Sequence, residues 1–145
     1  MKAIVAGRRR VLAAAALAAV SLALPAAAQD PRKNEAVAAA RDWLVLLDKH
    51  DIKRLYDASG KRFREGISAE KWAQVAESGR QQFGAVKQRT LVGAESPPET
   101  PNRPKGEFMT VVFRAEFEKR DVGQESLTLE READGKWRVI GYLMR

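Results

Sequence analysis

The hydrophobic pattern changes its period at Gly84, and this change limits the possible fold more than any other feature of the sequence. Before this glycine, apolar residues recur every three or four positions, as on amphipathic helices. After it, they alternate with polar residues, as in strands that bury one face. The pattern therefore predicts an α+β fold, with three N-terminal helices packed on a curved antiparallel four-stranded sheet.

Each of the three predicted helices has a polar residue that can cap its first turn, followed by an apolar stripe at helical spacing. The helices are expected at about residues 31–50, 52–59 and 68–83. Their candidate N-caps are Asp30 or Asn34, Asp51 and Ser68. Gly60 and Gly84 stand where the second and third helices should end.

Four strands are predicted after Gly84, at residues 85–94, 107–120, 124–132 and 136–145. A proline-rich loop separates the first two. The last two turns each end in glycine, at Asp121-Val122-Gly123 and Ala133-Asp134-Gly135. Three-residue loops with this glycine in the left-handed region keep the apolar faces together, whereas a two-residue turn at Asp134-Gly135 would mix them.

This choice of loops predicts a register. It pairs Leu129 with Val139 and Phe117 with Leu127, all on the inner face of the sheet. It also places two charged residues on that face. Arg131 would lie between Phe113 and Trp137, and Glu125 would form a structural ion pair with Lys119.

The N-terminal segment has the order of a secretory signal peptide. Lys2, Arg8, Arg9 and Arg10 precede an uncharged run at residues 11–24, and Pro25 and three alanines follow. The run is too short for a spanning helix, which needs about 20 apolar residues. We predict cleavage between Ala28 and Gln29, giving a signal peptide at 1–28 and a single α+β domain at 29–145 in the periplasm or outside the cell. An uncleaved anchor is the rival interpretation, and export by the general or the twin-arginine route stays open.

Cleavage changes what the charge implies. The chain has 26 Lys and Arg against 19 Asp and Glu, a net charge of +7. Without residues 1–28 the balance becomes 22 against 19, or +3, with both signs interspersed. Such a surface does not predict nucleic-acid binding. The chain has no cysteine, so neither a disulfide, a lipid anchor nor a thiol nucleophile is available.

Several stretches resemble the bacterial secreted family known as domain of unknown function 4019. These stretches are WLVLLDKHD, SAEKW, PKGEFMTVVFRAEF and DGKWRVIGY, which together span most of residues 29–145. One departure is Tyr56, where this family has tryptophan. The resemblance implies export and a cone-like fold similar to that of nuclear transport factor 2 and ketosteroid isomerase relatives. It implies no activity.

No set of residues has the spacing of a catalytic or metal site. His50 is the only histidine and stands between Lys49 and Asp51, where a capping or solvated role is expected. No catalytic residue, metal ligand or cofactor is therefore predicted, and the chain is more plausibly a binding protein than an enzyme.

Two functional hypotheses follow. The first is a non-enzymatic interaction or self-associating module, meeting an envelope protein or a second copy through apolar outer residues of the last strand: Ile140, Tyr142 and Met144. The second is a small-ligand-binding or isomerase-like pocket protein, with a pocket lined by Tyr56, Trp72, Arg131 and Trp137. In the pocket hypothesis, Arg131 anchors an anionic ligand; in the alternative it stacks on Trp137.

Overall fold

The computed structural model describes residues 29–145, so the predicted signal peptide at 1–28 lies outside the described residues. The described chain forms four helices followed by four strands, which confirms the predicted α+β class. The elements are α1 (Pro31–Asp48), α2 (Ile52–Ala58), α3 (Lys61–Gly66), α4 (Ala69–Phe83), β1 (Val86–Glu95), β2 (Glu107–Phe117), β3 (Arg120–Arg131) and β4 (Trp137–Met144). None of the helices within residues 29–145 is long and apolar enough to cross a membrane.

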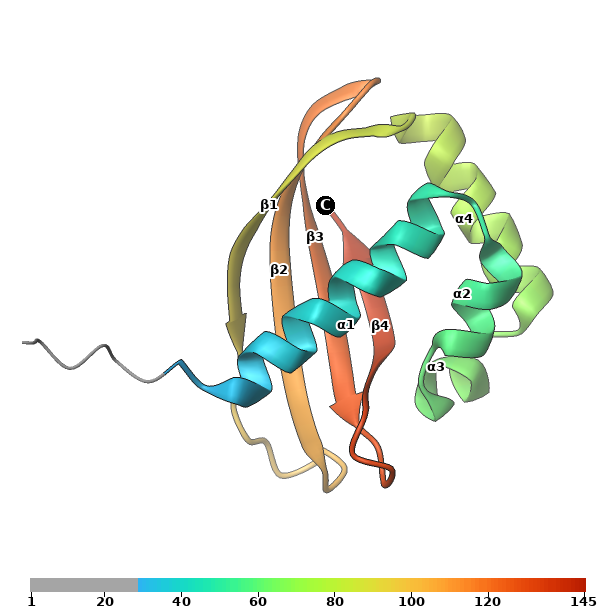
Figure 1. The fold of residues 1–145 in the computed structure, drawn as a ribbon. Coiled ribbons are helices and arrows are strands. Elements are labelled where there is room, and N and C mark those ends of the chain that lie inside the picture. The colour runs from blue at the N-terminus through green and yellow to red at the C-terminus, as the bar shows by residue number, and fades with distance from the viewer. Residues whose placement is uncertain (1–28) are drawn as a thin grey trace, which may run out of the picture.

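The four strands form one antiparallel sheet in the order β1-β2-β3-β4. Helix α1 crosses one face of this curved sheet diagonally, and α2, α3 and α4 gather beyond β4 (Figure 1). Consecutive strands are neighbours throughout, so the sheet is a simple meander. Helix α1 thus covers one face of the sheet, as the alternating pattern of the strands requires.

The helix boundaries follow the predicted caps. The side chains of Asp30, Asp51 and Ser68 each accept a hydrogen bond from a backbone N–H in the first turn of α1, α2 and α4. Gly84 ends α4 with φ of 75°, a conformation that favours glycine. The sequence did not predict α3, because Gly60 was expected only to end a helix and here also precedes a new one.

The core forms where α1 packs directly on the sheet. Ala36 and Ala40 of α1 are fully buried, and their small side chains let the helix backbone approach the strands. Facing them, the inner residues of β2 and β3 alternate with partly exposed ones. The fully buried strand residues include Val111, Phe113, Ala115, Leu127 and Leu129.

The predicted register between β3 and β4 is correct near the turn, where Leu129 pairs with Val139. A β-bulge between Thr128 and Leu129 then shifts the remainder. Beyond it, Leu127 pairs with Tyr142 and Glu125 with Met144, rather than Leu127 with Gly141. The bulge therefore turns Tyr142 and Met144 to the inner face.

The predicted register between β2 and β3 is wrong by six residues, since Leu127 pairs with Val111 and not with Phe117. The turn lies at Glu118 and Lys119, so residues 121–123 continue β3. The backbone N–H groups of Glu118 and Lys119 donate to the carbonyls of Ala85, just before β1, and of Phe83, at the end of α4. These two hydrogen bonds fix the turn there. Long-range contacts of this kind override the local glycine signal.

Candidate functional site

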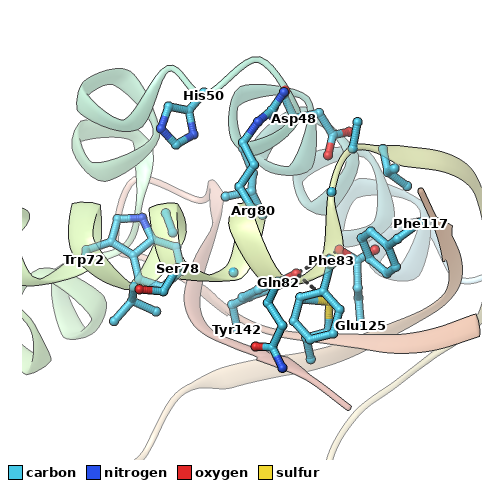
Figure 2. A pocket seen from close by; sticks show the side chains of 18 of the residues that line it. Asp48, His50, Trp72, Ser78, Arg80, Gln82, Phe83, Phe117, Glu125 and Tyr142 are labelled. Carbon is cyan, nitrogen blue, oxygen red and sulfur yellow. Dashed lines mark hydrogen bonds between the residues drawn. The ribbon is translucent and has the colours of Figure 1, made fainter. Parts of the chain in front are cut away.

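A cavity of about 550 Å³ lies between α4 and the end of the sheet where β4 finishes (Figure 2). Much of its wall is apolar, and the apolar side chains come from α1, α4, the start of β1 and the ends of β2 and β4. They are Leu47, Trp72, Val75, Phe83, Val86, Phe117, Leu143 and Met144. The volume falls within the range of pockets that bind small organic molecules.

Helix α4 leaves this space because its inner side carries small residues. Gly79 lines the cavity in the middle of the helix, and a β-carbon added there would meet no neighbouring atom within 4 Å. Glycine inside a helix costs roughly 1 kcal/mol relative to alanine. The local packing does not require this glycine, so its effect is to widen the cavity.

Four polar side chains from four elements meet at the cavity wall. Arg89 of β1 binds the carboxylate of Asp48 at the end of α1 through two hydrogen bonds, of 2.8 and 3.1 Å. The same guanidinium donates from Nε and Nη2 to Glu125 of β3. The hydroxyl of Tyr142 of β4 donates to Oε1 of Glu125 over 2.8 Å. We call these four residues the Arg89 cluster.

The Arg89 cluster is mostly shielded from solvent. The exposed fraction of the side chain is 1% for Glu125, 13% for Arg89 and 31% for Asp48. One guanidinium against two carboxylates leaves a formal charge of −1. A buried carboxylate of this kind is stable only because it is paired and hydrogen-bonded.

The surroundings shift the pKa values of two of these groups, Arg89 and Tyr142. Burial lowers the pKa of Arg89, but the hydrogen bonds and charges of Asp48 and Glu125 outweigh it and hold the pKa above its ordinary value. Burial, followed by the negative charge of Glu125, raises the pKa of Tyr142 well above that of a free phenol. Arg89 therefore stays protonated, and Tyr142 keeps the proton that it donates to Glu125.

Glu125 is poorly placed for proton transfer. Oε1 of Glu125 accepts from Tyr142 and Arg89, and Oε2 accepts from Arg89. A general base must reach the proton that it removes, and both oxygens here are held by internal donors. Glu125 therefore places a negative charge in the cavity wall without presenting a free base.

An aromatic group joins the cavity to the core. The ring of Tyr142 packs on Trp43 of α1, with centroids 5.3 Å apart, and on Trp72 of α4 at 6.3 Å. Trp43 in turn donates from Nε1 to Ser59, whose hydroxyl donates to the carbonyl of Leu55. These contacts fix the ring of Tyr142, and with it the position of the hydroxyl at Glu125.

Charged side chains also lie at the cavity mouth. His50 follows α1 with φ of 58° and places Nε2 3.0 Å from the carboxylate of Glu77 on α4. Arg80 donates to the backbone carbonyl of Asp48 over 3.1 Å. The solvated role expected for His50 thus includes a link between the end of α1 and α4.

The structure separates the four residues predicted as one pocket. Trp72 lines the cavity, whereas Tyr56 is not among the lining residues and its hydroxyl donates to the carbonyl of Ile67 over 2.8 Å. Trp137 and Arg131 lie at the opposite end of β4, where Arg131 donates to the carbonyl of Gly135 and faces Glu107. Arg131 pairs with Trp137 in register as predicted, but Phe113 instead pairs with Glu125.

The prediction that Ile140, Tyr142 and Met144 share the outer face is wrong. The bulge between β3 and β4 places Tyr142 and Met144 on the inner side, where both line the cavity. Ile140 lies against Gly60, since a β-carbon added to that glycine would come within 2.7 Å of Ile140. These three residues therefore do not form one apolar patch.

The Arg89 cluster was not predicted as a unit from the sequence. Glu125 was placed correctly on the inner face, but its predicted partner, Lys119, was wrong because the β2–β3 register was wrong. The available signal was a charged residue at an inner position of an otherwise apolar strand, which requires a partner. Within residues 29–145, no three His, Cys, Asp or Glu side chains gather as metal ligands would.

The chain belongs to the family described as Protein of unknown function (DUF4019), whose sequence profile matches residues 39–142. The resemblance drawn from the sequence is thereby confirmed. No functionally curated protein matches the sequence.

Two solved structures are similar in fold. The helical cell shape determining protein Pgp2 from Campylobacter jejuni matches with a TM-score of 0.49 and 11% identity, over 74% of this chain and 38% of that chain. A ketosteroid isomerase-like protein from Erwinia carotovora atroseptica matches with a TM-score of 0.47 and 14% identity, over 79% and 95%. At these identities neither protein transfers an activity to this chain.

Proposed function

We propose that this protein binds a small, largely apolar ligand in the cavity under α4 without transforming it. The observation that carries the proposal is the cavity itself, which combines apolar walls with a few fixed polar groups from the Arg89 cluster. Binding sites for small molecules have this composition, since apolar contact supplies affinity and the polar groups supply orientation. The internally paired Glu125 supports binding rather than acid–base catalysis.

Gly79 offers a direct test, because it faces the open cavity without supporting the core. Residues 29–145 would be titrated with N-phenylnaphthylamine, an uncharged fluorophore whose emission rises in apolar surroundings. The Gly79→Leu variant should bind the fluorophore at least about tenfold more weakly, because the new side chain occupies the cavity.

The Gly79→Ala variant is the matched control. It should keep the affinity for the fluorophore and gain about 0.5–1 kcal/mol in the free energy of unfolding, since alanine is the better helix former. Unaltered binding by a folded Gly79→Leu variant, or no binding by the wild-type protein, would refute the proposed function.

A further inference from the structure

We propose that the ligand of this cavity is an amine, with a protonated nitrogen seated at Asp48 and a hydrocarbon or aromatic body lying along α4. This inference rests on the proposed function and adds the chemical class of the ligand. It follows from the charge of the Arg89 cluster, from its unused hydrogen-bonding capacity and from the rings nearby.

Charge is the first consideration. The side chains of Asp48, Arg89 and Glu125 line the cavity with one positive and two negative charges. Among the three, Asp48 is the most exposed, at 31%, so the negative charge in excess is also the accessible one. A cation in the cavity would complete the pairing of a partly buried group.

The unused hydrogen-bonding capacity of the Arg89 cluster also favours a cationic ligand. Arg89 uses four of its five N–H groups on Asp48 and Glu125. Asp48 accepts only two hydrogen bonds at about four acceptor positions, and the hydroxyl oxygen of Tyr142 has an unused lone pair. Most of the unused capacity therefore accepts hydrogen bonds, which an ammonium group with up to three donors would satisfy.

The aromatic residues at this end of the cavity add to the preference. Trp72 and Tyr142 both line the cavity with their rings 6.3 Å apart, and Phe83 and Phe117 continue the aromatic wall. Aromatic faces attract cations, and the attraction is stronger where water is excluded. The same rings accept the hydrocarbon part of an aryl or alkyl amine.

The opposing consideration is two further cationic side chains that line the cavity, Lys71 and Arg80, of which Arg80 donates to the backbone carbonyl of Asp48. Both side chains belong to exposed residues, so solvent and salt screen them more strongly than the Arg89 cluster. If they governed recognition, the cavity would prefer anions. A preference for cationic ligands would therefore indicate recognition by the Arg89 cluster, and a preference for anionic ligands would indicate recognition by Lys71 and Arg80.

The experiment compares three ligands of similar shape: phenethylamine, phenethyl alcohol and hydrocinnamate. Each would displace N-phenylnaphthylamine from residues 29–145 at neutral pH and low salt. The amine should bind about tenfold more tightly than the alcohol, and the carboxylate should bind most weakly. Equal affinities, or tightest binding by the carboxylate, would overturn the inference.

The Asp48→Asn variant provides the second arm. It removes the excess negative charge, so the advantage of the amine over the alcohol should fall to about twofold or less. The Asp57→Asn variant is the control, because Asp57 pairs with Lys53 on the surface of α2 and its loss changes the net charge equally. It should keep the full preference.

The two proposals fail in different ways. If the fluorophore does not bind the wild-type protein, the proposed function fails. If the fluorophore binds but the three ligands show no amine preference, the ligand class is wrong and the proposed function stands. If the amine preference persists in Asp48→Asn, the placement of the protonated nitrogen at Asp48 is wrong. The ligand order in the wild-type protein tests the inference even where Asp48→Asn does not fold.

Discussion

Helices α1 and α4 both turn small residues toward the interior, yet the regions beneath the two helices are packed differently. We call these regions the α1 end and the α4 end. On α1, Ala36 and Ala40 are fully buried against the sheet. On α4, Gly79 faces a cavity of about 550 Å³. A small residue on a helix can therefore let the helix pack close to a sheet, or it can leave a cavity beside the helix. Only the tertiary structure distinguishes these two effects.

The two ends also differ in what stabilises them. Under α1, apolar side chains fill the space between helix and sheet. Under α4, the link between the end of α1 and the strands runs through Arg89, which binds Asp48 and Glu125. Substitutions beneath α1 and beneath α4 should therefore change the free energy of unfolding by different amounts.

The largest effect is expected from Arg89→Met. This variant keeps a side chain of similar length but leaves the carboxylate of Glu125 buried without its cation. Breaking one side of a buried ion pair typically costs about 3–5 kcal/mol. Urea unfolding of residues 29–145 would measure the loss.

Arg54→Met is the control for Arg89→Met, because the pair formed by Arg54 and Asp51 is exposed. Its cost should be less than about 1 kcal/mol. A similarly small cost for Arg89→Met would mean that the α4 end does not depend on the cluster.

A smaller effect is expected from Ala40→Leu, which contrasts the α1 end with Gly79→Leu at the α4 end. Ala40 has no exposed surface, so a larger side chain should force α1 from the sheet and cost about 2–3 kcal/mol. Gly79→Leu adds similar volume to open space and should change the free energy of unfolding by less than about 1 kcal/mol. Thermal or urea unfolding of the two variants would measure the contrast, and equal costs would remove the distinction between the two helices.

The sequence predicted the layout of the fold because that layout depends on local signals. The change of period at Gly84, the caps Asp30, Asp51 and Ser68, and the glycine turn after Ala133 are all local. Each acts through the backbone of a few neighbouring residues. These elements appear in the structure close to their predicted bounds.

The candidate site could not be predicted in the same way, because two non-local events create it. The turn between β2 and β3 is fixed by backbone hydrogen bonds from Glu118 and Lys119 to two residues between the end of α4 and β1, Phe83 and Ala85. The bulge between β3 and β4 leaves Ile140 of β4 without a partner between Val139 and Gly141, and it turns Tyr142 inward. Gly141 is a local signal for a bulge, but it does not specify which strand position is skipped. Only then do Arg89, Glu125 and Tyr142 meet.

Tyr142 contacts residues at both the α1 end and the α4 end. Removing its hydroxyl should give a smaller change in the free energy of unfolding than Arg89→Met or Ala40→Leu, and it tests a single hydrogen bond. The ring packs on Trp43 beneath α1, while the hydroxyl donates to Glu125 beside the cavity. Tyr142→Phe keeps the ring and removes the hydrogen bond to a charged group, so the variant should lose about 1.5 kcal/mol at neutral pH.

The sign of the pH dependence follows from the raised pKa of Tyr142. In the unfolded chain this phenol ionises near pH 10, whereas in the folded protein it keeps its proton to higher pH. The advantage of the wild-type protein over Tyr142→Phe should therefore be constant below about pH 9 and decline as pH rises beyond about pH 10. Urea unfolding of both proteins across this range gives the difference, in which the titration of other groups cancels. If this difference in the free energy of unfolding stayed constant or grew at alkaline pH, the hydroxyl of Tyr142 would not be buried against Glu125. The link that Tyr142 makes between the cavity wall and the packed region beneath α1 would then be wrong.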